Sequence, residues 1–71
     1  NQGLTVTEIV IVKWHKKIGE TLQKGETLLE FETDKSVIEL VSPTDGILSK
    51  IVAAEGATIA IGGIVGAITI P

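Results

Sequence analysis

The chain has 71 residues and no cysteine, so it holds one small domain without a disulfide or a thiolate metal site. Nine acidic and six basic side chains give a net charge of −3, which argues against non-specific binding to nucleic-acid phosphates. Its longest uncharged stretch, residues 56–71, has 16 residues and four glycines, whereas a membrane-spanning helix needs about 20 apolar residues. Aromatic residues make up only 3%, so the core must consist of Ile, Val, Leu and Ala.

In chain order, the sequence predicts short strands separated by turns. Residues 8–13 form a β-branched run, and residues 27–33 alternate in the manner of a half-buried strand. Residues 37–41 form the next predicted strand, which ends at the turn-forming Pro43 and the Asp45-Gly46 pair. Residues 46–52 and 64–70 complete the set, and a helix fits only at residues 15–18. We therefore expect an all-β fold, either a small sandwich or a flattened barrel.

The sequence also contains an internal repeat. The pattern G-x-T-aliphatic-x-x-G occurs at residues 19–25 and again 37 positions later, at residues 56–62. The same offset aligns Thr7 with Thr44, Val10 with Ile47, Lys13 with Lys50, Leu28 with Val65 and Phe31 with Ile68. This predicts two copies of one supersecondary unit, related by a pseudo-two-fold axis.

Residues 29–40 predict a β-hairpin with Asp34 and Lys35 at its turn. The expected facing pairs are Thr33 with Ser36, Phe31 with Ile38, and Leu29 with Leu40. Because side chains alternate along a strand, the outer face then carries Glu30, Glu32, Val37 and Glu39. A shift of one residue would turn the glutamates toward the core, so the pattern places Lys35 at the tip, in water. Residue type alone would favour a simple solvated charge at this position.

The tip sequence Glu32-Thr33-Asp34-Lys35-Ser36 resembles the lipoyl domains of the E2 acyltransferases in 2-oxo acid dehydrogenase complexes. Members of that family carry lipoic acid on the lysine of a similar Glu-Thr/Ser-Asp-Lys-Ala/Ser tip. Residues 12–20 are similar to the family's VVKWLKKPGD stretch, residues 25–30 to its lead into the tip, and residues 42–46 to its Pro/Gly break. The chain departs from the family at Ile9, where glycine is frequent, and at Ile18, where proline is frequent.

This resemblance implies a fold of two four-stranded antiparallel sheets in a flattened barrel, with the lysine hairpin at one end and both termini at the other. It implies that residues 1–71 are a single lipoyl domain excised from a larger multidomain chain. By position, Lys35 would be the lipoyl attachment residue, flanked in the turn by Asp34 and Ser36.

The resemblance further implies a non-catalytic carrier, because the chemistry belongs to the lipoic acid cofactor. The implied partners are a lipoate ligase or lipoyl transferase, a thiamine-dependent E1 decarboxylase, the E2 catalytic core and the E3 dihydrolipoyl dehydrogenase. We expect no catalytic residue, no metal site, no nucleic-acid or membrane partner, and a monomeric isolated domain. The location would be the cytoplasm in a bacterium or the mitochondrial matrix in a eukaryote.

Charge is unevenly distributed along the chain. Residues 26–39 have a net charge of −4, whereas the remainder has +1. We therefore expect an acidic hairpin end that basic partners could recognise, and we assign this role to Glu8, Glu30, Glu32 and Glu39. A solvated outer face that aids solubility is the alternative.

Two other functions stay open. A biotinyl carrier domain has a similar fold, but it flanks its lysine with methionines, and this chain contains none. An unmodified interaction module would use the fold only for protein contacts. Neither His15 nor Trp14 is expected to take part in chemistry: His15 has no suitable partner for catalysis, and Trp14 suits the core.

Overall fold

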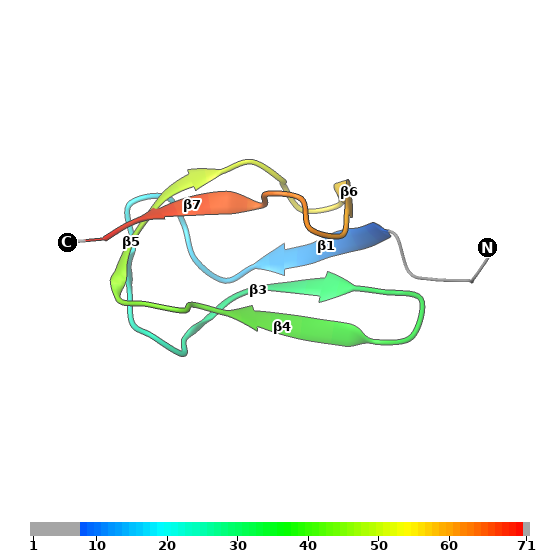
Figure 1. The fold of residues 1–71 in the computed structure, drawn as a ribbon, viewed down its shortest axis with the longest axis horizontal. Helices are drawn as coiled ribbons and strands as arrows, with labels where there is room; N and C mark the ends of the chain where they lie inside the picture. The colour runs from blue at the N-terminus through cyan, green and yellow to red at the C-terminus, as the bar shows by residue number, and fades with distance from the viewer. Residues whose placement is uncertain (1–7, 71) are drawn as a thin grey trace.

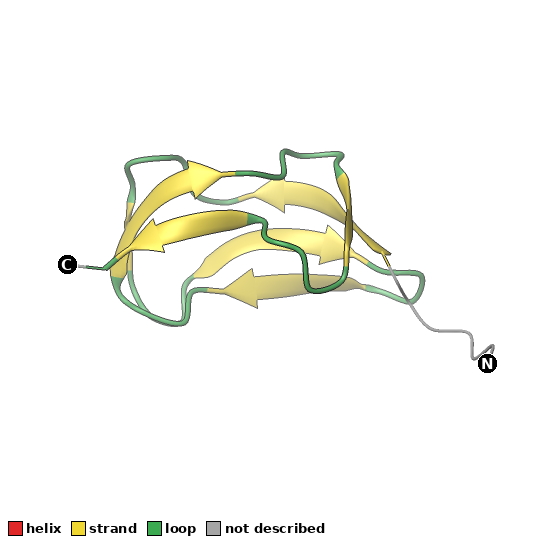
Figure 2. Ribbon diagram, turned by 45° about the horizontal axis from the view of Figure 1, so that its top comes forward, coloured by secondary structure: helices red, strands yellow, loops and turns green. Residues whose placement is uncertain are grey.

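The computed structural model describes residues 8–70, and within them it contains strands and loops only (Figures 1 and 2). The strands are β1 (Glu8–Trp14), β2 (Thr21–Leu22), β3 (Thr27–Glu32), β4 (Val37–Val41), β5 (Gly46–Ile51), β6 (Thr58–Ala60) and β7 (Gly66–Thr69). In this part of the chain there is accordingly no helix that could cross a membrane.

The strands form two antiparallel sheets that pack face to face (Figure 2). The larger sheet has the order β4-β3-β1-β6, and the smaller one has the order β2-β5-β7. The predicted all-β fold with two antiparallel sheets is confirmed. The smaller sheet differs from the expectation because three described strands form it rather than four, and the two sheets do not close into a barrel.

All five predicted strands are present, with ends within two residues of the expected positions. β2 and β6 were not predicted as strands. They have only two and three residues, and each lies inside a Gly-x-Thr repeat segment, where the glycines indicated turns.

The internal repeat is confirmed by backbone geometry. The backbone nitrogen of Gly19 donates to the oxygen of Leu48, and that of Gly56 donates to the oxygen of Ile11, both at 2.7 Å. Both partner strands contain a bulge at the matching place, directly after Ile11 in β1 and directly after Leu48 in β5. The repeat glycines have left-handed backbones with similar φ angles: 95° at Gly19, 91° at Gly25, 87° at Gly56 and 89° at Gly62. The two repeat segments and the bulged strands that they contact therefore share one backbone conformation.

The core lies between the sheets in two clusters of buried aliphatic side chains. One consists of Ile11, Leu29 and Ala53, and the other of Leu22, Leu28 and Leu48. Trp14 packs against both clusters, and its indole Nε1 donates to the oxygen of Ala53 at 2.7 Å. The expected packing role of Trp14 is confirmed, since its ring connects the clusters and its one polar group is satisfied.

The β3–β4 hairpin projects at one end of the molecule, and β7 runs to the opposite end (Figure 1). β1, however, begins at the hairpin end. The expectation that both termini lie opposite the hairpin stays a prediction, because the N-terminal residues lie outside the described part. Residues 1–7, which include most of the loop at residues 4–8, lie outside the described part.

Candidate functional site

The hairpin has the register that the hydrophobic alternation predicted. Phe31 pairs with Ile38 and Glu30 pairs with Glu39. At the tip, the backbone nitrogen of Thr33 donates to the oxygen of Ser36 at 2.9 Å. Asp34 and Lys35 are consequently the two residues at the bend.

The side chain of Thr33 closes this turn, a role that was not predicted. Its hydroxyl oxygen accepts hydrogen bonds from the backbone nitrogens of Lys35, at 3.1 Å, and Ser36, at 3.2 Å. Threonine hydroxyls commonly mimic a backbone acceptor in this way, so the signal was present in the Thr-Asp-Lys-Ser sequence. No described non-glycine residue has a positive φ, which explains how this bend is formed without glycine.

Lys35 is exposed at the tip, together with its neighbours Asp34 and Ser36. Its backbone is tied to Thr33, whereas among the described residues its ammonium has no hydrogen-bond or ion-pair partner. The structure thus brings together a fixed backbone and an unhindered amine. Such an amine can react with an activated carboxyl group brought by a partner enzyme, once it has lost its proton.

The predicted recognition residues lie on the outer face of the larger sheet. Glu30 pairs with His15 through the ring Nε2, and Glu39 accepts a hydrogen bond from the Thr27 hydroxyl at 3.1 Å. Glu32 is exposed opposite Val10 of β1, and Glu8 is exposed two residues before Val10. All four glutamates therefore share one face, although their part in recognition stays a prediction.

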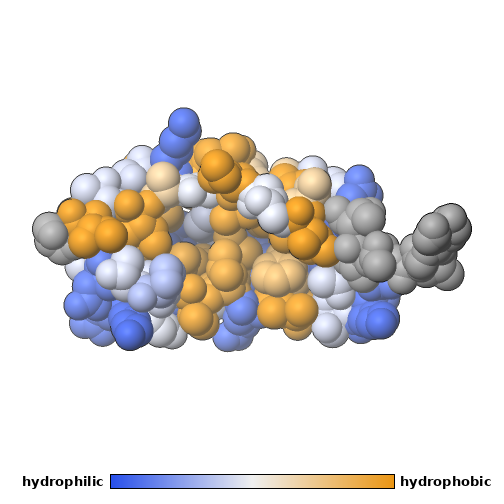
Figure 3. Space-filling model, in the orientation of Figure 1, coloured by the Kyte–Doolittle hydropathy of each residue, from blue (hydrophilic) through white to orange (hydrophobic). Residues whose placement is uncertain are grey.

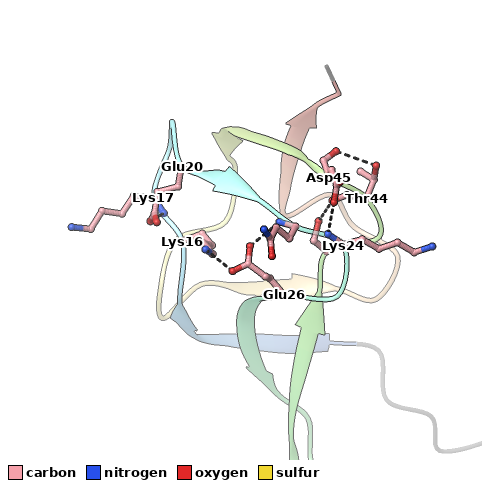
Figure 4. A network of polar contacts seen from close by, with 9 residues as sticks. Lys16, Lys17, Glu20, Lys24, Glu26, Thr44 and Asp45 are labelled. Atoms are coloured by element: carbon pink, nitrogen blue, oxygen red, sulfur yellow. Dashed lines mark hydrogen bonds and ion pairs between the residues drawn. The ribbon is translucent and has the colours of Figure 1, made fainter.

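The expected acidic hairpin end is smaller than the sequence indicated. Glu26 precedes β3 at the end remote from the tip, where Lys16 Nζ lies 3.0 Å from its carboxylate (Figure 4). The backbone nitrogen of Gln23 also donates to this carboxylate, at 2.7 Å. The hydrogen bond from the Gln23 backbone is the main cause that holds the pKa of Glu26 below its ordinary value, and the contact with Lys16 lowers it further. Counting residues 26–39 as one charged unit was wrong, because an antiparallel hairpin carries its two ends away from its turn.

The inner face of the hairpin is apolar but incompletely covered. Leu29 is fully buried, yet its partner Leu40 is 37% exposed and Ile38 is 43% exposed. The predicted burial of this face holds for Leu29 and in part for Phe31 of β3, but not for Ile38 and Leu40 of β4.

In the described part of the chain, no cluster of three or more His, Asp or Glu side chains is placed to hold a metal ion. Glu30, Glu32 and Asp34, which alternate along the strand, do not form one.

Residues 1–68 match the model of the biotin/lipoyl family, described as "biotin-requiring enzyme". The chain belongs to this family. A solved structure with the same fold is the lipoyl domain of the 2-oxoglutarate dehydrogenase complex from Azotobacter vinelandii. Its TM-score is 0.79 at 36% sequence identity, and the match covers 89% of this chain and 80% of that one.

Curated members of the family include two dihydrolipoyllysine-residue succinyltransferase components of 2-oxoglutarate dehydrogenase complexes. The protein of Buchnera aphidicola is 44% identical over 62 residues, and that of Rickettsia bellii is 47% identical over 60 residues. These matches cover 87% and 84% of this chain but only 15% of each relative. The chain therefore corresponds to a small part of those proteins.

Proposed function

We propose that this chain is a lipoyl carrier domain, with lipoic acid joined in an amide bond to Nζ of Lys35. The observation that carries the proposal is the exposed ammonium, which has no partner among the described residues, at a turn whose backbone is fixed by Thr33. The 36% identity to a solved lipoyl domain and the lipoyllysine named for the curated relatives support it. When bound, the dithiolane would supply acyl-transfer and electron-transfer chemistry.

The chain's own contribution would be position and reach. Leu29 anchors the hairpin in the core, and Thr33 holds the tip backbone, so Lys35 extends from a rigid base. Amide formation joins the lipoyl carboxyl carbon to Nζ, with loss of a proton from the nitrogen and of the activating group from the carbon. Tethering then sets the effective concentration of the arm at each partner site. No residue of this domain needs to act as an acid, base or nucleophile.

The proposed partners follow from this role. A lipoate ligase or lipoyl transferase would attach the arm, and a thiamine-dependent E1, an E2 core and a flavin-dependent E3 would use it in turn. The names of the relatives favour the 2-oxoglutarate complex. Within the cell the domain would be found with that complex, in the bacterial cytoplasm or the mitochondrial matrix. Reductive acylation of the lipoylated chain by several E1 enzymes would identify the complex, and we expect the 2-oxoglutarate enzyme to be fastest.

Intact-mass spectrometry tests the attachment. The chain is coexpressed with a lipoate ligase or, separately, with a biotin ligase, and Lys35→Arg serves as the matched control. We expect a single octanoyl or lipoyl adduct on Lys35 and none on the variant, which keeps its charge and fold. Streptavidin reactivity would instead support the biotinyl carrier that the family description permits. A folded chain without any adduct would favour an interaction module and overturn the proposal.

Recognition of a basic partner surface by the outer glutamates is a separate proposal. Glu8, Glu30, Glu32 and Glu39 supply the negative charge on this face, and salt should weaken their steering of the partner. We expect the rate of reductive acylation to fall as the salt concentration rises. A rate that stays constant from low to high salt would exclude electrostatic steering.

A further inference from the structure

We propose that the charge on Lys35 discriminates between the unmodified and the lipoylated domain. The ammonium weakens docking of an unmodified tip at the positively charged mouth of a 2-oxo acid decarboxylase, and amide formation removes this repulsion. The proposal rests on the proposed function. It adds to that function a reason why a carrier without its arm does not occupy the partner enzyme.

Lys35 is the single cation at the hairpin end of the described chain. Three segments meet there: the start of β1, the bend at residues 32–37, and the loop at residues 60–65. Three carboxylates and one ammonium are the charged groups in these segments, from Glu8, Glu32, Asp34 and Lys35. This end therefore has a net charge of −2, and residues 1–7 contain no charged side chain. Figure 3 shows hydrophilic side chains at the hairpin end and apolar ones along the middle of the same face, so contacts of the tip depend mainly on charge.

Amide formation changes this charge by one unit. The ammonium of Lys35 first loses a proton, and Nζ then attacks the carbonyl carbon of an activated lipoyl group. The new N–C bond forms as the bond to the activating group breaks, that group keeps the electron pair, and Nζ loses a second proton. The resulting amide is neutral, so the three carboxylates remain without a cation and the hairpin end has a net charge of −3.

The ammonium lies close enough to the acidic side chains to offset their field. Among the described residues it has no hydrogen-bond or ion-pair partner, so its charge faces the solvent and any approaching surface. Asp34 is its neighbour in the bend, and Glu32 lies three positions away, a distance of at most about 11 Å along the backbone. These separations are comparable with the Debye length, which is about 10 Å at 0.1 M salt. A partner surface therefore senses the lysine and the carboxylates together.

The internal repeat indicates that the fold does not require a carboxylate at residue 32. Val10 pairs with Glu32 in β1–β3, and Ile47 pairs with Thr69 at the corresponding place in β5–β7, 37 positions later. An uncharged threonine therefore satisfies the same strand geometry. The negative charge beside the tip consequently serves interaction rather than folding.

A thiamine-dependent decarboxylase supplies the complementary charge. Its substrate, a 2-oxo acid, carries a carboxylate, and thiamine diphosphate carries a diphosphate, so the site that binds both is positively charged at its mouth. The carboxylates of the hairpin end are attracted to such a mouth, and the ammonium of an unmodified tip is repelled by it. A repulsive group of this kind raises specificity by weakening the wrong complex. Lipoylation thus supplies the reactive arm and improves docking in the same step.

Two variants that cannot be lipoylated test the effect of charge alone. Lys35→Gln is neutral, as the lipoyl amide is, whereas Lys35→Arg keeps the cation. Each is added as a competitor to reductive acylation of the lipoylated chain by the E1 enzyme that acylates this chain fastest. At about 0.01 M ionic strength, where the Debye length is about 30 Å, we expect the inhibition constant of Lys35→Gln to be about threefold lower than that of Lys35→Arg. At about 1 M, where the Debye length is about 3 Å, the two constants should be equal.

Lys24→Gln combined with Lys35→Arg has the same net charge as Lys35→Gln and is the matched control. Lys24 is exposed between β2 and β3, at the end remote from the tip, and its side chain points away from the neighbouring polar contacts (Figure 4). This control should inhibit no better than Lys35→Arg alone. Glu32→Thr, which introduces the residue found at the related place in β7, should raise the inhibition constant of Lys35→Gln about threefold.

Equal inhibition by Lys35→Gln and Lys35→Arg at low salt would overturn the proposal. So would a Lys24 control that inhibits as well as Lys35→Gln, since net charge rather than the tip would then decide. Absence of inhibition by every variant, each shown to be folded by urea denaturation, would also overturn it, because E1 would then recognise the arm alone. A chain without an adduct in the intact-mass experiment would instead overturn the proposed function, so the two failures are distinguishable.

Discussion

The hydroxyl oxygen of Thr33 lies 3.1 Å from the backbone nitrogen of Lys35, so the turn is closed by a side chain two residues ahead of the proposed modified lysine. The same oxygen receives a second hydrogen bond, from the Ser36 nitrogen. The hairpin thereby presents Lys35 from a defined backbone position while leaving its amine in water.

Removal of the Thr33 hydroxyl should loosen the tip without unfolding the domain. Thr33→Val keeps the branched shape but deletes the acceptor for two hydrogen bonds, a local cost of about 1 kcal/mol at this exposed site. We expect the initial rate of lipoylation to fall about fivefold, with faster hydrogen exchange at residues 35 and 36. Thr33→Ser retains the hydroxyl, so this variant should be lipoylated at nearly the normal rate. Equal rates for the valine and serine variants would show that the ligase does not depend on this turn.

Moving the lysine by one position should reduce lipoylation more than the loss of the Thr33 hydroxyl does. In Asp34→Lys with Lys35→Ala, the amine is carried by residue 34, whose backbone nitrogen does not donate to the Thr33 hydroxyl as that of residue 35 does. The side chain at this position also points in a different direction. Intact-mass spectrometry should show at least a tenfold loss of modification. The exchange Asp34→Lys with Lys35→Asp keeps composition and net charge, so it controls for electrostatics. Undiminished modification of either variant would mean that tip geometry is irrelevant to attachment.

Much of the site could be predicted because side-chain alternation fixes strand register. One face of residues 29–40 is apolar and the other carries glutamates, so Phe31 could pair only with Ile38, as observed. The repeat was equally visible, because a left-handed backbone at Gly19 and Gly56 restricts the residue type at both positions.

Other features depend on long-range contacts that local patterns do not encode. The two-residue strand β2 exists only because β5 pairs with it. The Lys16–Glu26 contact joins residues ten positions apart with β2 between them, so the charge count could not show that Glu26 lies away from the tip. The exposure of Leu40 likewise depends on what packs over its face of the sheet. The alternation of apolar residues along β4 carries no information about that packing.

Glycine has different roles at Gly46 and Gly62, and alanine substitutions should separate them. A Cβ at Gly46 would lie 2.6 Å from the oxygen of Thr69 and 2.7 Å from Cγ2 of Ile68, so β5 and β7 would have to move apart. We expect Gly46→Ala to cost about 2–4 kcal/mol in urea denaturation. Gly62 has open space but a φ of 89°, so Gly62→Ala should cost only about 1 kcal/mol. Similar costs for the two variants would contradict the close approach of β7 to Gly46.

Glu26 should make stability dependent on pH in the acidic range. Its pKa is lower in the folded chain than its ordinary value of 4.5, because the ionised carboxylate accepts hydrogen bonds from the Gln23 backbone and Lys16. The unfolded chain therefore binds a proton more readily at this group. Its stabilising contribution is complete above pH 4.5 and is lost as the pH falls through the lower, folded-state pKa.

The variant Glu26→Gln removes this titration while keeping a side chain of similar size. We expect it to be less stable than the original chain at pH 7, with the difference shrinking steadily below pH 4.5. Urea unfolding at a series of pH values measures both curves. Glu32→Gln is the matched control, because Glu32 is exposed and has neither a backbone nor a lysine partner among the described contacts. The difference in unfolding free energy between this variant and the original chain should stay small at every pH. A difference for Glu26→Gln that grows on acidification would mean that the carboxylate is destabilising, contrary to its contacts.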